Sequence, residues 1–237
     1  MSTKTIYQRY LFEPFIIGNM KDKLRLVSLV LTFLLLLSIF IASLFSSLDP
    51  DLGWHLKYGE YFFQNNSILR GNTFSSLMPD YEWNNSSWAT DLLTYLTFNN
   101  SGFLGLSVLA ALVITATFFF IGKAARLSLF EKSIIFPILF YFVLPVNKVS
   151  FRGQLLSMLF IALMFYILSR FEQTNRKALL LLIPLFLVWS NFHGEFILGL
   201  ALFLIWVFVY SAKEIIMHFR NNISSFFKKE KFLFVSL

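Results

Sequence analysis

The chain contains no cysteine, and only 14% of its 237 residues are charged. The absence of cysteine excludes disulfides, thiolate catalysis and cysteine-ligated metal sites. A soluble domain carries about a quarter charged residues, so the shortage of charge, together with 57% hydrophobic residues and 31 phenylalanines, excludes a soluble protein. No glycine-rich phosphate-binding loop is present, so the sequence gives no sign of a nucleotide-binding site of that type. The sequence therefore indicates an integral membrane protein.

Long apolar runs predict how often the chain crosses the membrane. The uncharged run 26–48 has 23 residues, and a helix needs about 20 residues to span the hydrocarbon. The residues after this run do not resemble a signal-peptide cleavage site, so we expect it to remain as the first span. The further apolar runs are 103–122, 134–146, 153–169, 178–190, 196–212 and, at the end of the chain, 232–237. We predict an all-α membrane protein, a polytopic helical bundle of six transmembrane helices with the stub of a seventh, and expect it to be the N-terminal part of a longer protein.

Basic residues are divided unevenly between the two sides of these spans. With a cytoplasmic N-terminus, sixteen lysines and arginines fall inside and four outside, which is the usual bias of membrane proteins. The net charge of +7 is explained by this bias, and no nucleic-acid partner is needed. We therefore predict a multi-pass protein of the cell membrane with a cytoplasmic segment 1–25, an extracytoplasmic loop 49–102, spans two to six within 103–212, and a cytoplasmic loop 213–231.

The outer loop is too polar to span the membrane and too rich in Trp and Tyr to be a simple linker. Residues 52–63 predict a short amphipathic helix that begins after Asp51, a favourable N-cap residue. Asp51 and His55 are four residues apart and would share one face of that helix. A second helix is predicted over 88–98 and is expected to end in the Asn-Asn-Ser-Gly stretch 99–102. We expect both helices to lie along the membrane surface.

Two predicted hairpins have unusually short first arms. Runs 134–146 and 178–190 have 13 residues each, or about 20 Å of helix against about 30 Å of hydrocarbon. Their polar apices, 147–154 and 191–195, are therefore expected to lie below the outer surface and to border a cavity that opens outwards. The alternative is that flanking residues extend each helix to full length, which would leave the apices as ordinary loop tips.

The sharpest local motif is Asp49-Pro50-Asp51 at the outer end of the first span. Two carboxylates at this place could bind a hard divalent cation such as Mg²⁺ or Mn²⁺ through oxygen. One of them could instead act as a general base. The structural alternative is that the motif only stops and caps a helix at the interface.

The motif and its surroundings resemble a known family. Pro50-Asp51, Trp54-His55-Leu56 and the Trp189–Gly194 apex are similar to segments of membrane glycosyltransferases of the GT-C superfamily, in a bacterial branch of that superfamily. The resemblance implies a long first outer loop with juxtamembrane helices, and a sugar donor attached to a polyprenyl phosphate. Leu52 stands where many members carry a second acid, which is a departure from the family pattern and puts a metal requirement in doubt.

The resemblance also implies roles for individual residues. Asp51 would take the proton of the acceptor, and Asp49 would be its partner or a metal ligand. From its place near Asp51, His55 is also expected to be catalytic, although pairing with Asp51 could simply cap the helix. A departing phosphate needs a cation, and we assign this role to Arg152 ahead of Lys148 because guanidinium binds phosphate in a bidentate manner. Arg152 could instead reach the outer headgroups, and a lone His193 could be a structural hydrogen bonder. The remaining residues expected to contact substrate are Trp54, Trp88, Asp91, Gln154, Asn191 and His193.

The leading functional hypothesis is an inverting glycosyltransferase that moves a sugar from a polyprenyl phosphate to a glycan, lipid or protein acceptor on the extracytoplasmic side. A membrane transporter or lipid flippase is the alternative from another class. No cytoplasmic connection shows polar residues entering a span, so the sequence favours the enzyme. A third hypothesis is an assembly subunit whose Trp-rich loop binds a protein partner.

Overall fold

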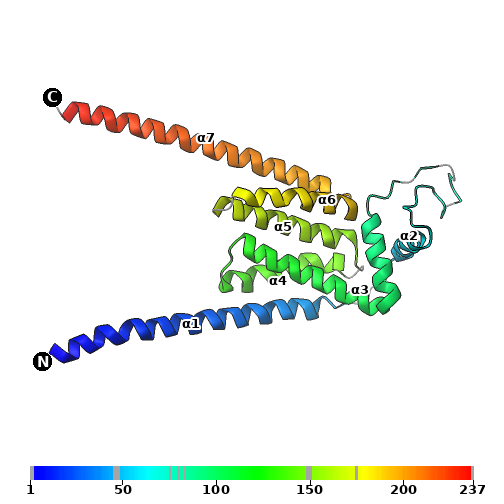
Figure 1. Cartoon of the computed structure of the whole chain (residues 1–237), viewed down its shortest axis with the longest axis horizontal. Helices are drawn as coiled ribbons and strands as arrows, with labels where there is room; N and C mark the ends of the chain where they lie inside the picture. Colours follow the sequence, from blue (N-terminus) through cyan, green and yellow to red (C-terminus); the bar gives the residue numbers. More distant parts are fainter. Residues whose placement is uncertain are drawn as a thin grey trace. The chain divides into compact units, whose positions relative to one another are not determined.

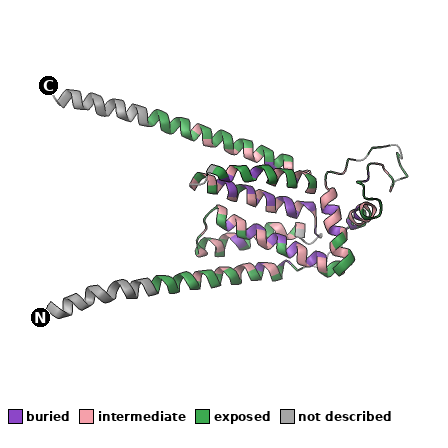
Figure 2. Ribbon diagram, in the orientation of Figure 1, coloured by how far each residue is buried: buried purple, intermediate pink, exposed green. Residues whose placement is uncertain are grey.

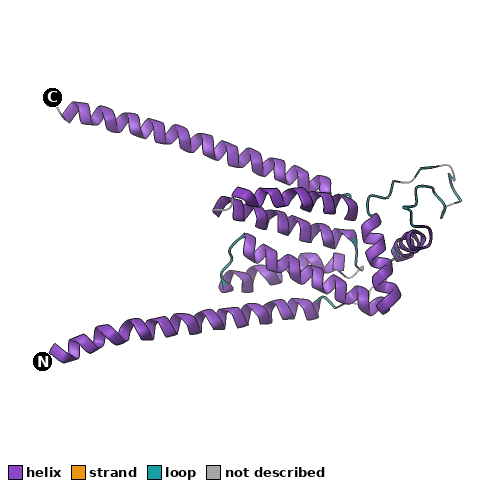
Figure 3. Ribbon diagram, in the orientation of Figure 1, coloured by secondary structure: helices purple, strands orange, loops and turns teal. Residues whose placement is uncertain are grey.

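The computed structural model describes residues 3–44, 49–74, 76–78, 81–82, 84–147, 151–173 and 176–235. Every regular element in these residues is a helix, and strand-like pairing is limited to one isolated bridge between Gly71 and Glu82 (Figure 3). The chain divides into two compact units, Met1–Gly194 and Glu195–Leu237. Five helices of the described chain are long and apolar enough to cross a bilayer. The protein is therefore an all-α, multi-pass membrane protein, as predicted.

The first unit is a bundle of antiparallel helices with a shorter helix at one end (Figure 1). Its elements are α1 (Thr3–Ala42), α2 (Leu52–Asn65), α3 (Trp88–Ala124), α4 (Leu129–Asn147), α5 (Gly153–Gln173), the 3₁₀ helix η1 (Arg176–Leu181) and α6 (Leu182–Phe192). The end of α4, the start of α5 and the end of α6 lie at the same end of the bundle as α2, whereas the end of α3, the start of α4 and the end of α5 lie at the opposite end. How these ends are oriented in a membrane stays a prediction from the charge pattern.

Helix α3 consists of two helices that meet at Gly102. Gly102 has φ 57° and ψ −148°, a combination that is essentially restricted to glycine. Figure 1 shows the chain turning at this point from a short segment beside α2 into the bundle. The predicted end of the first helix near 99–102 is thus confirmed, although Asn99, Asn100 and Ser101 are still helical.

Helix α4 is longer than its apolar run. It begins at Leu129, five residues before the predicted start at Ile134, because Ser128 and Glu131 form a reciprocal cap. The Ser128 backbone N–H donates to Glu131 Oε2 at 2.6 Å, and the Glu131 N–H donates to Ser128 Oγ at 3.3 Å. The expectation of a short first arm is therefore wrong for this hairpin. Span 129–146 has 18 residues, so flanking residues do extend it.

Two other predicted boundaries change. Helix α1 ends at Ala42, where the Ser43 hydroxyl donates to the Ile39 carbonyl, and part of the predicted continuation to Leu48 lies outside the described residues. Helix α6 and η1 together remain shorter than a full span, as predicted. In the second unit, α7 (Phe196–Val235) continues through the predicted loop 213–231 and the start of the predicted stub, because polar residues without glycine or proline do not stop a helix.

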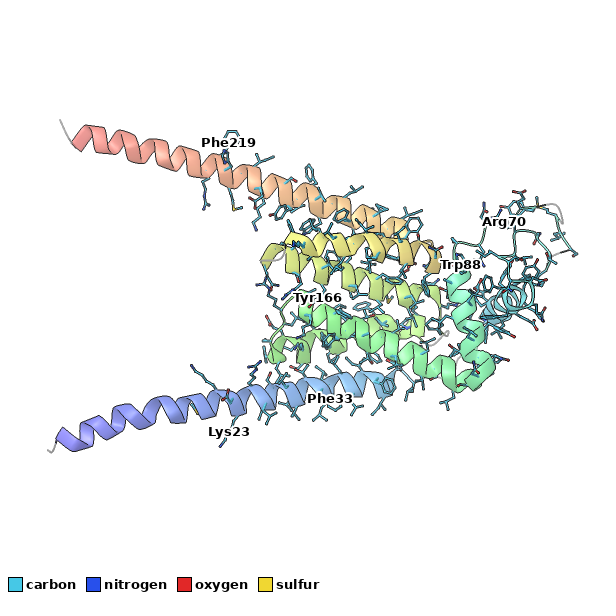
Figure 4. All side chains as sticks on the ribbon, in the orientation of Figure 1. Lys23, Phe33, Arg70, Trp88, Tyr166 and Phe219 are labelled. Carbon is cyan, nitrogen blue, oxygen red and sulfur yellow. The ribbon has the colours of Figure 1, made fainter. Side chains whose placement is uncertain are left out.

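The core of the first unit lies between α3, α5 and α6 (Figure 2). Small residues on α3, including Ala110 and Ala111, are buried and allow a neighbouring helix to approach closely. Trp189 of α6 is fully buried and stacks on Phe160 of α5 at a centroid distance of 5.6 Å. Outward apolar side chains such as Phe33 on α1 are exposed in the unit, as a lipid-facing surface requires (Figure 4).

Candidate functional site

One arginine ties the two aspartates after α1 to the first hairpin apex. Arg152, just before α5, donates from Nε to Oδ2 of Asp49 at 2.7 Å, and from Nη2 to Oδ1 of the same carboxylate. Its Nη2 also donates to Oδ2 of Asp51 at 2.8 Å. The acidic motif and the first apex are therefore in direct contact. We refer to Asp49, Asp51 and Arg152 as the ion cluster.

The members of the ion cluster differ in burial. The Asp49 side chain is fully buried, whereas 59% of the Asp51 side chain is exposed. Burial by itself raises the pKa of Asp49, but the hydrogen bonds from Arg152 and from the Asp51 N–H, with the Arg152 charge, outweigh it and lower that pKa. The hydrogen bond with Asp49 also raises the pKa of Arg152. Asp49 is therefore an ionised partner of Arg152, and Asp51 is the carboxylate that can reach other molecules.

The expected cap at the start of α2 does not form in the usual way. Asp51 is the N-cap residue, yet its side chain makes no capping hydrogen bond because Arg152 holds it. Asp51 and His55 do face the same cavity, which agrees with their predicted common face. They are not an ion pair, since the imidazole of His55 pairs elsewhere.

A buried carboxylate on α3 holds His55. Nδ1 of His55 lies 2.6 Å from Oδ1 of Asp91, and the Asn85 amide donates to Oδ2 of Asp91. Only 3% of the Asp91 side chain is exposed, against 25% for His55. Burial lowers the pKa of His55, but the hydrogen bond and charge of Asp91 and the charge of Asp49 raise it overall. The three residues form an Asn–Asp–His chain that joins α2 to α3.

Glycine at position 59 makes this join possible. A Cβ at Gly59 would lie 2.4 Å from Cβ of Tyr95 and 2.6 Å from the carbonyl oxygen of Asp91. No larger side chain fits that space without moving α2 away from α3. Phe63 of α2 stacks on Tyr95 with a centroid distance of 5.5 Å and adds to the contact. The geometry of the His55–Asp91 pair is thus set by the close packing of the two helices.

A cavity of about 570 Å³ lies against this pair. Small-molecule sites typically measure about 300–1,000 Å³, so its volume suits a small ligand or part of a larger one. The lining side chains combine aromatic rings, amides, hydroxyls and acids; they are Asp51, Trp54, His55, Tyr58, Asn72, Asn84, Asn85, Ser86, Ser87 and Asp91. Apart from His55, none of these residues is basic.

This cavity is not the predicted one, which was to be bordered by both apices, and a cavity at the apices stays a prediction. The described apex residues are 151–154 and 191–194, and none of them lines the cavity. The apices instead pack on each other: a Cβ at Gly153 would lie 2.4 Å from Cδ2 of His193. His193 Nδ1 also lies 3.0 Å from the hydroxyl of Ser157, which accepts a hydrogen bond from Trp189 Nε1. His193 is therefore a structural hydrogen bonder, the alternative that the sequence had left open.

The second apex also holds the start of α3. Trp88 Nε1 donates to Oδ1 of Asn191 at 2.9 Å, and the Thr90 hydroxyl donates to the Phe192 carbonyl. Trp88 and Asn191, both expected to contact substrate, thus fix the segment of α3 that carries Asp91. The second apex therefore supports the segment of α3 that lines the cavity, but it does not line the cavity itself.

The expected site residues lie in different places: some line the cavity or belong to the ion cluster, some form the apex contacts, and two belong to neither set. Asp51, His55, Trp54 and Asp91 line the cavity, with Asp49 and Arg152 directly behind Asp51. Asn191, His193 and Trp88 belong to the apex contacts, and Gln154 is a half-buried residue of α5. Lys148 lies outside the described residues.

Several lining residues were missed by sequence reasoning. Asn84, Asn85, Ser86 and Ser87 precede the predicted second helix, and nothing in their spacing shows that Asn85 binds Asp91. Tyr58 falls within the predicted amphipathic helix 52–63. It lies one turn after Trp54, which lines the same cavity, and this helical spacing could have identified it.

The aspartates do not fit the tentative metal site. Both carboxylate oxygens of Asp49 and one of Asp51 accept hydrogen bonds from Arg152, so a guanidinium already supplies the positive charge. A structural or catalytic metal is normally held by several side-chain ligands. No group of three His, Cys, Asp or Glu residues suited to a metal occurs in the part of the chain that the structure describes. We therefore derive no step through a metal ion.

Comparison with known proteins gives no match: no protein-family model, no curated protein and no solved structure corresponds to this chain. The likeness to GT-C glycosyltransferases stays a prediction from the motifs. A function must be inferred from the ion cluster, the Asn85–Asp91–His55 chain and the cavity that they border.

Proposed function

We propose that the protein is a membrane glycosyltransferase that moves a sugar from a polyprenyl phosphate donor to an acceptor hydroxyl, with inversion at the anomeric carbon. The observation that carries this proposal is the placement of Asp51 in the wall of the cavity, held there by Arg152. This places a carboxylate and a guanidinium at one spot next to the predicted membrane surface. The proposed orientation has the N-terminus in the cytoplasm and the cavity outside.

Arg152 is suited to bind the phosphate. Its described hydrogen bonds use Nε and Nη2, and Nη1 has no partner among the described residues. The Arg152 guanidinium can therefore keep its hydrogen bonds to Asp49 and Asp51 and still donate one from Nη1 to a phosphate oxygen. Since charge builds on that oxygen as the phosphate leaves, such a donor stabilises the transition state more than the ground state.

The cavity lining supports a carbohydrate ligand. The rings of Trp54 and Tyr58 lie 6.5 Å apart and offer apolar faces, while Asn72, Asn84 and Asn85 offer amide donors and acceptors. Sugars have both C–H faces and hydroxyls, so this mixture matches them better than a purely apolar ligand. A hydroxyl acceptor must also lose a proton, and two lining groups can take it: Asp51, which the resemblance implies, and His55.

The test uses the full chain in lipid nanodiscs with polyprenyl phosphates that carry radiolabelled hexoses or pentoses, and a mixture of glycan and lipid acceptors. We expect acceptor-dependent release of free polyprenyl phosphate. Arg152→Lys keeps the positive charge but loses the planar guanidinium and its bidentate hydrogen bonding. It should slow release about 10²-fold, the usual effect of removing a transition-state donor. Lys57→Gln is the matched control, because the exposed Lys57 pairs with Glu60 on α2 outside the cavity lining.

Two results would contradict the proposal. The first is no release from any donor in the panel by the unmodified protein. The second is movement of intact donor from one leaflet to the other in proteoliposomes without release, which would identify a flippase. Binding of a protein partner that survives Arg152→Lys, in the absence of turnover, would favour the assembly subunit.

A further inference from the structure

We propose that His55, oriented by Asp91 and Asn85, is the acid–base group of the cavity and accepts the proton of the attacking hydroxyl at Nε2. This inference rests on the proposed transfer reaction and moves the proton-accepting role from Asp51 to His55. Asp51 then keeps the hydroxyl and Arg152 in position. Asp91 and Asn85 are positioning residues, because neither needs to touch the reacting atoms.

Hydrogen bonding fixes which ring nitrogen can accept a proton. Asp91 is an acceptor, so neutral His55 carries its proton on Nδ1, which lies 2.6 Å from the carboxylate. The other oxygen of Asp91 is held by the Asn85 amide, so the carboxylate cannot rotate freely. Nε2 has no partner among the described residues, and the ring lines the cavity. A base must be within hydrogen-bond reach of the proton that it takes, and this nitrogen is the one available.

The surroundings favour His55 over Asp51 as the base. Protonating Asp51 would neutralise a carboxylate that accepts a charge-assisted hydrogen bond from Arg152. Protonating His55 instead creates an imidazolium beside Asp91, a buried carboxylate that is 3% exposed. Protonation of His55 therefore creates a favourable charge interaction with Asp91, whereas protonation of Asp51 would weaken its interaction with Arg152.

The charges around His55 act in both directions. Asp91 faces it from α3, Asp51 lies one turn earlier on α2, and Asp49 and Arg152 lie in the ion cluster nearby. Burial and Arg152 lower the pKa of His55, whereas Asp91 and Asp49 raise it, with a net increase from the ordinary value of 6.5. The raised pKa makes neutral His55 a stronger base than an ordinary histidine.

The reaction balances with these groups alone. The acceptor oxygen forms a bond to the anomeric carbon, and the bond from that carbon to the phosphate oxygen breaks with its electron pair on the phosphate. The hydroxyl proton moves to Nε2 of His55 and later to water. The lipid phosphate leaves with one more negative charge, which a hydrogen bond from the Arg152 guanidinium would stabilise.

The first experiment does not require turnover. The chain contains three histidines, so ¹⁵N-histidine NMR of the full protein in nanodiscs, assigned with His193→Asn and His218→Asn, can follow His55. We expect neutral His55 to carry its proton on Nδ1. Asp91→Asn should move its titration midpoint to lower pH, whereas Glu60→Gln, which removes a half-buried acid that pairs with Lys57 on the same helix as His55, should leave it in place. A proton on Nε2, or a midpoint that does not respond to Asp91→Asn, overturns the proposal.

The second experiment follows transfer against pH in the same assay. His55→Gln should reduce the maximal rate about 10²–10⁴-fold and remove its rise with pH, as expected on loss of a general base. Asp91→Asn should reduce the rate at least about tenfold and shift the rise to lower pH. A normal rate in His55→Gln overturns the role of His55. Absence of transfer in the unmodified protein overturns the proposed function instead, and the NMR result then decides the His55 assignment alone.

Discussion

Arg152 and Asp49 form a two-point ion pair, with Nε facing Oδ2 and Nη2 facing Oδ1. This pair joins the end of the first span to the first hairpin apex, which are more than a hundred residues apart in the chain. The Asp49 side chain is fully buried, so its charge depends on this partner. Loss of the arginine would leave a carboxylate in the interior without compensation.

Arg152→Gln should therefore destabilise the protein. Removing one partner of a buried ion pair costs about 3–5 kcal/mol, and we expect about 3 kcal/mol here because 21% of the Arg152 side chain is exposed. The measurement is unfolding in detergent followed by tryptophan fluorescence. Lys57→Gln, which breaks the exposed Lys57–Glu60 pair, should cost less than about 1 kcal/mol. Equal effects of the two substitutions would contradict the buried pair.

The pKa of Asp49 predicts how stability depends on pH. Its folded-state pKa is lowered from 3.8, so the unfolded chain binds a proton more readily than the folded protein does. The stabilisation is complete above the ordinary value and is lost as pH falls through the folded-state value. The stability difference between the native protein and Asp49→Asn should therefore be constant near neutral pH and shrink at acidic pH. A difference that grows as the pH falls would show the opposite sign.

Much of the fold follows from local sequence. Apolar runs predict the spans, and the Asn-Asn-Ser-Gly stretch predicts the break at Gly102. The early start of α4 was not predicted, because the apolar run alone begins at Ile134. Ser128 and Glu131 nevertheless have the spacing of a capping box, which marks the true start of the helix. Local patterns of this kind need no knowledge of distant parts of the chain.

The site depends on contacts that local patterns do not contain. His55 was expected beside Asp51 on its own helix, but it pairs with Asp91, 36 positions away. That choice is decided by how closely α2 approaches α3, and the approach depends on the missing side chain at Gly59. A single sequence shows the glycine, yet it does not show which helix lies against it.

The role of Gly59 can be tested within α2 itself. Gly59→Ala places a Cβ 2.4 Å from Tyr95, so we expect α2 to shift and stability to fall by about 1–3 kcal/mol. Gly53 lies in the same helix with open space around its Cβ position. Gly53→Ala should be neutral or stabilise by up to about 1 kcal/mol, because alanine favours helix. The contact between α2 and α3 would be in doubt if the two alanines had the same effect on thermal unfolding.

Gly102 offers a second backbone test. A Cβ there would meet no atom within 4 Å, so any effect of Gly102→Ala must come from its positive φ of 57°. We expect a loss of about 1–3 kcal/mol in the free energy of unfolding. Ser101→Ala, one residue earlier in regular helix, is the control and should change stability little. Equal stability of the two variants would mean that α3 does not need the break.

The proposed orientation can be tested by cysteine labelling, because the chain has no cysteine of its own. Ser76 lies in the exposed loop before α3, and Ala125 follows α3 at the opposite end of the bundle. The basic residues near Ala125, including Lys123 and Arg126, should keep that end in the cytoplasm. We expect a membrane-impermeant maleimide to label Ser76→Cys in intact cells and Ala125→Cys only after permeabilisation. The reverse pattern would place the cavity, Asp51 and His55 on the cytoplasmic side, where an extracytoplasmic acceptor could not reach them.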